Sequence, residues 1–148
     1  MEISRESALE MLRKHNRDES HLKHAFAVEA TMGFFAGKLG GDVEKWRLAG
    51  LLHDIDWETT QAAPEKHTHE GSRWLAEAGY PEDIVRAVLA HGWGIVSDAK
   101  PESDMEKVLF TVDELTGLVM TAALVRPSRS VQDLEVKSVK KKWKDKAF

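Results

Sequence analysis

The stretch AGLLHDID, residues 49–56, decides how this 148-residue chain is read. Its apolar half continues the pattern of Val43, Trp46 and Leu48, and helical spacing of this kind predicts a buried helix that ends near His53. Burying an unpaired carboxylate beside such a segment is energetically costly. Asp54 therefore needs a cation or strong hydrogen-bond donors close to it.

A helical pattern extends over most of the chain, with no clear strand alternation and no hairpin-turn pair. Ser4, Asp42 and Ser103 are expected N-caps, and glycine at 40–41 is expected to end a helix. We expect loops over 55–66 and 92–102, and a break or kink at Gly117. The sequence thus predicts an all-α fold: a compact single-domain bundle, 1–148, of about seven helices. They are expected at 4–15, 19–39, 42–54, 69–78, 81–91 and 103–125, with a basic C-terminal helix at about 135–148.

The composition excludes several classes of protein. The chain has no Cys, so a disulfide framework, a thiolate nucleophile and a Cys-ligated zinc are excluded. No run of about 18 apolar residues is present, and the amphipathic, acid-containing start is unlike a secretory signal, so we expect a cytoplasmic protein without membrane contact. The formal net charge of −4 argues against general nucleic-acid affinity.

Histidines and aspartates fall at ends or on apolar faces of the expected helices. A lone group of this kind is usually a satisfied core residue. A set of six is also consistent with a metal site built from nitrogen and oxygen ligands, and the residues alone leave both interpretations open. The set comprises His24, His53, Asp54, His69, His91 and Asp113. Of the remaining histidines, His15 is interpreted as a cation at a helix C-terminus and His21 as an exposed polar residue. His67 is interpreted as a loop residue, with support of a neighbouring ligand as the alternative.

The order His24, His53-Asp54, Asp113 resembles the HD-domain superfamily of metal-dependent phosphohydrolases, and in particular its small HDIG-like hydrolases. His53-Asp54 follow A-G-L-L, and His24 precedes apolar residues at the spacing A-x-x-V. The segment HEGSRWLAEAGYP resembles the H-x-x-x-G helix of members with two further histidines, and AHGW resembles their helix-end histidine. The chain departs from the common H-D-I-G-K form, because Trp57 occupies the Lys position.

The resemblance implies one divalent ion held by His24, His53, Asp54 and Asp113, and a second held by Asp54, His69 and His91. Nitrogen and oxygen ligands suit Mn, Fe, Mg, Zn, Co or Ni. The implied activity is hydrolysis of a phosphate ester of a small molecule, a nucleotide by preference, through a metal-activated hydroxide, with Asp54 and His53 as catalytic residues. Phosphomonoesterase and phosphodiesterase activity are not distinguished.

Other residues have two interpretations each. Trp57 and Trp93 either stack on a substrate base or anchor the core. Arg126 and Arg129 either hold phosphate or form a solvated pair. Candidates for a general acid, each also explained as an ordinary surface acid, are Glu58, Glu70 and Asp56.

Two alternative functions remain open at this stage. One is a regulatory or binding HD module with a structural metal site and little or no activity. The other is a metal-free helical interaction domain that works through the basic tail, where six Lys oppose Glu135 and Asp145. A solvated helical face is the simpler interpretation of that tail.

Overall fold

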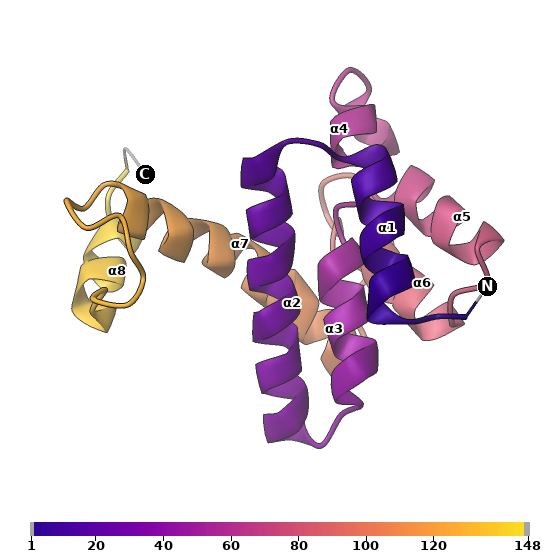
Figure 1. Ribbon diagram of the computed structural model, residues 1–148, viewed down its shortest axis with the longest axis horizontal. Helices are drawn as coiled ribbons and strands as arrows, with labels where there is room; N and C mark the ends of the chain where they lie inside the picture. The colour runs from indigo at the N-terminus through magenta and orange to yellow at the C-terminus, as the bar shows by residue number, and fades with distance from the viewer. Residues whose placement is uncertain (1, 147–148) are drawn as a thin grey trace. The chain divides into compact units, whose positions relative to one another are not determined.

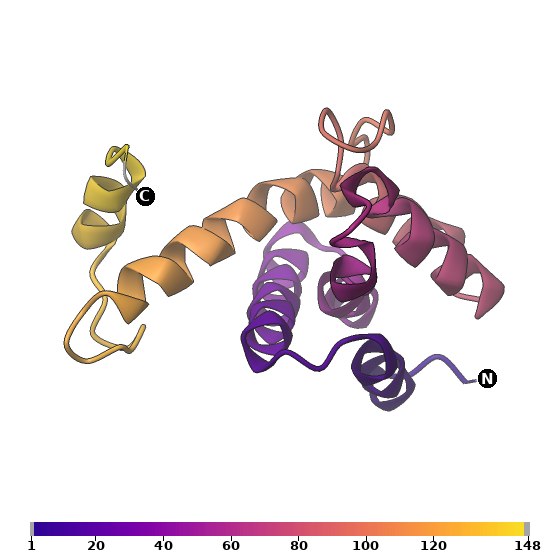
Figure 2. The same ribbon diagram turned by 90° about the horizontal axis from the view of Figure 1, so that it is seen from above.

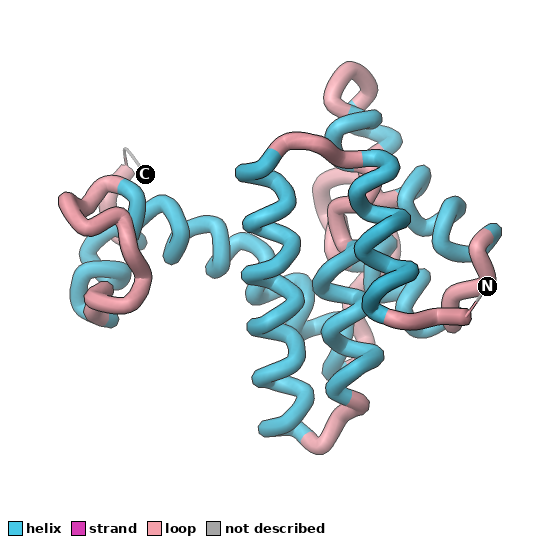
Figure 3. Tube along the Cα trace, in the orientation of Figure 1, coloured by secondary structure: helices cyan, strands magenta, loops and turns pink. Residues whose placement is uncertain are grey.

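The computed structural model describes residues 2–146, and its helices are shown in Figures 1 and 3. Among these residues no strand occurs, and a single β-bridge joins Trp93 to Ser97. The predicted all-α fold and the predicted number of long helices are confirmed. The helices are α1 (Arg5–His15), α2 (Glu19–Leu39), α3 (Val43–Leu52), α4 (Trp57–Thr60), η1 (Pro64–Lys66), α5 (His69–Glu77), α6 (Glu82–Ala90), α7 (Asp104–Leu124) and α8 (Val136–Trp143).

The helix ends follow the predicted caps. Ser4 accepts from the Ser7 amide, Asp42 accepts from the Lys45 amide, and Gly40 ends α2 in the left-handed conformation with φ 73°. The predicted loop at 55–66 instead contains α4 and η1, whose single turns are too short to show a helical period. The predicted break at Gly117 is absent, because a single half-buried glycine costs a helix only about 1 kcal/mol.

The axes of α1, α2 and α3 lie roughly parallel in Figure 1, with α2 running opposite to α1 and α3, and Figure 2 views them nearly end-on. Gly50 sets the distance between α2 and α3. A Cβ at this position would lie 2.9 Å from the Val28 carbonyl oxygen and 3.0 Å from the Glu29 Cα. Only glycine therefore allows this close approach, which brings the end of α3 beside α2 and so places His53 and Asp54 near His24.

A buried ion pair network joins the same three helices. Glu29 on α2 accepts from Arg5 of α1, with Nη2 at 2.9 Å, and from Arg47 of α3, with Nη2 at 3.0 Å. The Glu29 side chain is 4% exposed. Two guanidinium groups compensate the desolvation of this carboxylate and fix the helices against one another.

The chain divides into two compact units, Met1–Val112 and Asp113–Phe148. Helix α7 begins in the first unit and ends in the second, and the basic helix α8 belongs to the second. The single-domain boundaries expected from the sequence stay a prediction. Over residues 2–146, no helix is long and apolar enough to cross a membrane.

Candidate metal centre

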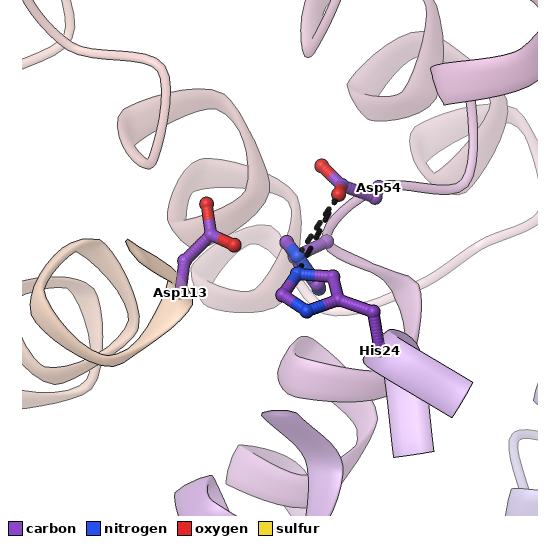
Figure 4. A group of neighbouring side chains, drawn as sticks. His24, Asp54 and Asp113 are labelled. Carbon is purple, nitrogen blue, oxygen red and sulfur yellow. Dashed lines mark ion pairs between the residues drawn. The ribbon is translucent and has the colours of Figure 1, made fainter. Parts of the chain in front are cut away.

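Four imidazoles converge on Asp54, the residue that follows the end of α3. Its Oδ2 lies 3.2 Å from Nε2 of His53 and 3.9 Å from Nε2 of His24, a pair drawn in Figure 4. Its Oδ1 lies 3.3 Å from Nε2 of His67 and 3.2 Å from Nε2 of His91. Each oxygen of this carboxylate, whose side chain is 12% exposed, thus faces a separate pair of histidines.

Helix ends explain the orientation of two of these rings. His53 and His91 are the C-caps of α3 and α6, where the last carbonyls lack helical partners. Nδ1 of His53 lies 2.7 Å from the Gly50 carbonyl, and Nδ1 of His91 lies 2.6 Å from the Val88 carbonyl. A carbonyl can only accept, so Nδ1 donates and Nε2 is the nitrogen left to face Asp54.

His67 is oriented by a carboxylate. Its Nδ1 lies 2.7 Å from Oδ1 of Asp56, which is fully buried. The Trp57 ring meets the His67 ring edge-on, with ring centroids 5.2 Å apart. His67 therefore presents Nε2 to Asp54 in the same way as His53 and His91.

The turn that carries Asp54 is tied down through its backbone. Asn16 donates to the Ile55 carbonyl at 2.7 Å, and Nε2 of His21 lies 3.2 Å from the Asp54 carbonyl. His21 is buried, so its interpretation as an exposed residue was wrong. Burial lowers the pKa of His21 despite the charge of Asp54, which favours a neutral ring that donates to this carbonyl.

The carboxylate of Asp54 and the surrounding imidazoles shift one another's pKa values. Burial by itself would raise the pKa of Asp54, but the charge of His53 and hydrogen bonds from His53, His67 and His91 hold it well below its usual range. Burial by itself would lower the pKa of His67, yet hydrogen bonds and charge from Asp54 and Asp56 raise it to about 9. His67 therefore carries a proton at neutral pH in the absence of a metal ion.

The donor set fits a divalent metal. Asp54, His67 and His91 offer ligand atoms within 4.8 Å of one another, and so do Asp54, His24 and His53. Buried imidazole and carboxylate groups are ligands for transition ions. Asp113, also drawn in Figure 4, is the first residue of the second unit, and its role as a further ligand stays a prediction.

Comparison with known families agrees with this geometry. The family model described as "HD domain" matches residues 21–139. The chain belongs to the HD domain family. This membership confirms the resemblance seen in the sequence and places the chain among metal-dependent hydrolases. The matched residues include all four imidazoles around Asp54 and continue across the boundary between the two units.

Curated relatives of this HD domain include several proteins named Ribonuclease Y. The protein of Nitratidesulfovibrio vulgaris is 30% identical over 96 residues, which are 65% of this chain and 18% of the relative. That of Lawsonia intracellularis is 31% identical over 114 residues, 77% of this chain and 21% of the relative. The chain thus spans about a fifth of the length of these relatives. No solved structure matches.

The second histidine pair differs from the one expected. His69 is exposed, and its Nε2 lies 2.7 Å from the Val96 carbonyl, whereas His67 faces Asp54. The sequence contained the signal that separates them. Counted strictly, the H-x-x-x-G spacing runs from His67 to Gly71, and His69 is only two residues from that glycine. The structure therefore brings together His24, His53, Asp54, His67 and His91, and leaves His69 outside.

The predicted substrate residues lie in different settings. Trp57 is 45% exposed, and Trp93 is 37% exposed and packs on Phe110 with ring centroids 5.7 Å apart. In the second unit, Arg126 donates to the Asp133 carbonyl at 2.7 Å, and Arg129 has a positive φ of 50°. Contact between any of these four residues and a substrate stays a prediction.

The candidates for a general acid are all engaged elsewhere. Both oxygens of buried Asp56 accept hydrogen bonds, from His67 and from the Gly71 amide. Glu58 accepts from the Arg17 and Asp18 amides, and Glu70 is paired with Arg73. Asp56 is therefore excluded as a solvent-facing proton donor, and this geometry favours neither Glu58 nor Glu70.

Proposed function

We propose that this HD domain is a metal-dependent phosphohydrolase that cleaves a phosphate ester of a nucleotide. One observation carries the proposal: Asp54 lies between two pairs of imidazoles that point Nε2 at its two oxygens. Two adjacent ions that share one carboxylate suit a phosphoryl group, whose oxygens need positive charge on both sides. A bound divalent ion would supply Lewis acidity and hydroxide at neutral pH.

The protein residues have separate tasks in this proposal. His24, His53, Asp54 and Asp113 would hold one ion, and Asp54, His67 and His91 would hold the other. His67 would have to give up its Nε2 proton to hold an ion, while Asp56 accepts the proton that stays on Nδ1. Asn16 and His21 hold the backbone of the Asp54 turn, so the carboxylate does not turn away from either pair.

Exposed aromatic rings support a nucleotide as the substrate. Trp57 contacts His67 and is also open to solvent, so its ring borders the site. Lys100 lies over the Trp93 ring at 5.7 Å and adds positive charge to the second exposed ring. Any of the nucleotide bases can stack on such an aromatic ring. The relatives named Ribonuclease Y favour a ribonucleotide phosphodiester.

The test is a substrate screen with the purified chain. We expect turnover of 5′-mononucleotides, cyclic dinucleotides, p-nitrophenyl phosphate esters or short oligoribonucleotides in the presence of Mn, Fe, Mg, Zn, Co or Ni. Asp54→Ala should abolish turnover, whereas Asp83→Asn, which breaks the exposed pair with Lys45, should retain it. A wild type that is silent with every metal and substrate would contradict the proposal.

The screen also separates the remaining alternatives. An HD module with a structural metal site would bind ions with no turnover of any substrate. Turnover limited to oligoribonucleotides would replace the small nucleotide with RNA, against the expectation from net charge. The metals that support turnover would identify the ion. The cytoplasmic location stays a prediction.

A further inference from the structure

We propose that Asp56 is a positioning residue for the second metal ion, because its carboxylate sets the tautomer and direction of His67. The inference rests on the proposed metal-dependent function. It concerns a residue outside the proposed ligand set, because both of its carboxylate oxygens accept from other partners.

The carboxylate of Asp56 is held between two donors. Oδ1 accepts from Nδ1 of His67 at 2.7 Å, and Oδ2 accepts from the Gly71 amide at 2.7 Å. Asp56 is 0% exposed, so water does not compete for either oxygen. The geometry leaves the carboxylate one orientation, and this orientation is passed on to the imidazole.

The position of His67 in the chain explains why a carboxylate is needed. His53 and His91 end helices and use the unsatisfied carbonyls of their own last turns. His67 also ends a helical turn, η1, but the carbonyl three residues before it, that of Pro64, already accepts from the His67 backbone amide at 3.1 Å. Helix α5, which follows, offers unsatisfied amides instead of carbonyls at its N-terminus. A partner from outside the helix must therefore accept the Nδ1 proton.

Asp56 serves two groups at the start of α5: the Nδ1 proton of His67 and an unsatisfied amide of the first helical turn. Thr68, the N-cap residue of α5, makes no capping hydrogen bond with its side chain, and its φ of 69° is unusual for a β-branched residue. Asp56 takes over the cap by accepting from the Gly71 amide in the first turn of α5. One carboxylate thus caps the helix and orients the histidine that precedes it.

Gly71 makes this contact possible. A Cβ at residue 71 would lie 3.2 Å from Oδ2 of Asp56 and 3.0 Å from Cγ2 of Ile55. Both are tighter than ordinary contacts, so a side chain here would push the start of α5 away from Asp56. The glycine of the H-x-x-x-G spacing is thereby explained by the hydrogen bond that orients its histidine.

The first test compares metal binding by Asp56→Asn and by the matched control Glu58→Gln. The Asn oxygen can still accept from the Gly71 amide, but its NH₂ group then faces Nδ1 of His67 and favours the tautomer with the proton on Nε2. In calorimetric titrations with Co²⁺ alone, we expect Asp56→Asn to weaken the second ion about 10–100-fold. The first ion, and both ions of Glu58→Gln, should bind as in the wild type. Equal binding of both ions by Asp56→Asn would overturn the proposal.

The second test reads the tautomer directly and needs no metal. At a pH at which the His67 ring is neutral, ¹⁵N NMR of the metal-free chain should show the proton on Nδ1 in the wild type and on Nε2 in Asp56→Asn. A proton on Nε2 in the wild type would overturn the inference. A proton on Nδ1 together with a wild type that binds no ion would contradict the proposed function and support the positioning by Asp56.

Discussion

Two carboxylates of the first unit, each largely shielded from solvent, differ in their partners. Glu29 on α2 is held by the guanidinium groups of Arg5 and Arg47. Asp54, at the end of α3, is held by imidazoles. Their side chains are similarly inaccessible, at 4% and 12% exposed. Burial alone therefore does not separate a structural carboxylate from a functional one.

The chemistry of the partner makes the difference. A guanidinium stays protonated at any ordinary pH, so Glu29 is permanently neutralised and serves to lock α1, α2 and α3. An imidazole releases its proton near neutral pH and then offers a nitrogen lone pair. A metal ion can therefore replace the imidazole protons around Asp54. A metal ion cannot replace the guanidinium charges around Glu29, because a guanidinium does not release its proton.

The largest effect is expected from Asp54→Ala, which removes the carboxylate shared by both ions. Loss of a residue that only supports a ligand costs about 10–100-fold in metal affinity, so loss of the shared ligand should cost more. Elemental analysis of the purified variant should find no bound metal, and turnover should be lost. Retention of both ions would show that Asp54 is as purely structural as Glu29.

The next effect separates two neighbouring histidines. We expect His67→Ala to lose the second ion, because its Nε2 faces Asp54, and His69→Ala to keep both ions, because its ring bonds the Val96 carbonyl. Metal content and turnover of the two variants, measured side by side, check this expectation. The opposite pattern would restore the ligand set expected from the sequence.

This pair of histidines shows how far the sequence could be read. Helix positions followed from apolar periodicity and from caps such as Ser4 and Asp42, and His53 followed from the end of such a helix. His67 was assigned to the polar loop that precedes the helix opened by His69. Its place beside Asp54 depends on Asp56 and Gly71, whose contacts join residues that are distant along the chain and have no local period.

A smaller effect is expected from Glu29→Gln, the counterpart of the Asp54 variant. Hydrogen bonds to charged groups contribute about 1.5–3 kcal/mol each, and the partial exposure of Arg5 and Arg47 should keep the total cost near about 2 kcal/mol. Denaturant unfolding should show the lower free energy of unfolding, with bound metal unchanged. Loss of metal without loss of stability would contradict the structural role of Glu29.

The smallest effect, counted as the change in metal affinity per pH unit, comes from the proton that His67 must lose before it can bind the second ion. The pKa of His67 is raised to about 9, so below that pH the second ion must displace a proton. Its affinity should therefore rise by about tenfold per unit between pH 7 and 9 and level off above 9. Titrations at several pH values check this slope. An affinity that is constant over this range would indicate that His67 is not a ligand.

The account is tested most directly by a crystal structure of the chain loaded with Mn²⁺ or Co²⁺, with the ions located by anomalous scattering. We predict one ion on each side of Asp54, with Nε2 of His67 and Nε2 of His91 bound to the second. A structure in which no ion contacts Asp54, or in which His69 replaces His67 as the ligand, would contradict the account.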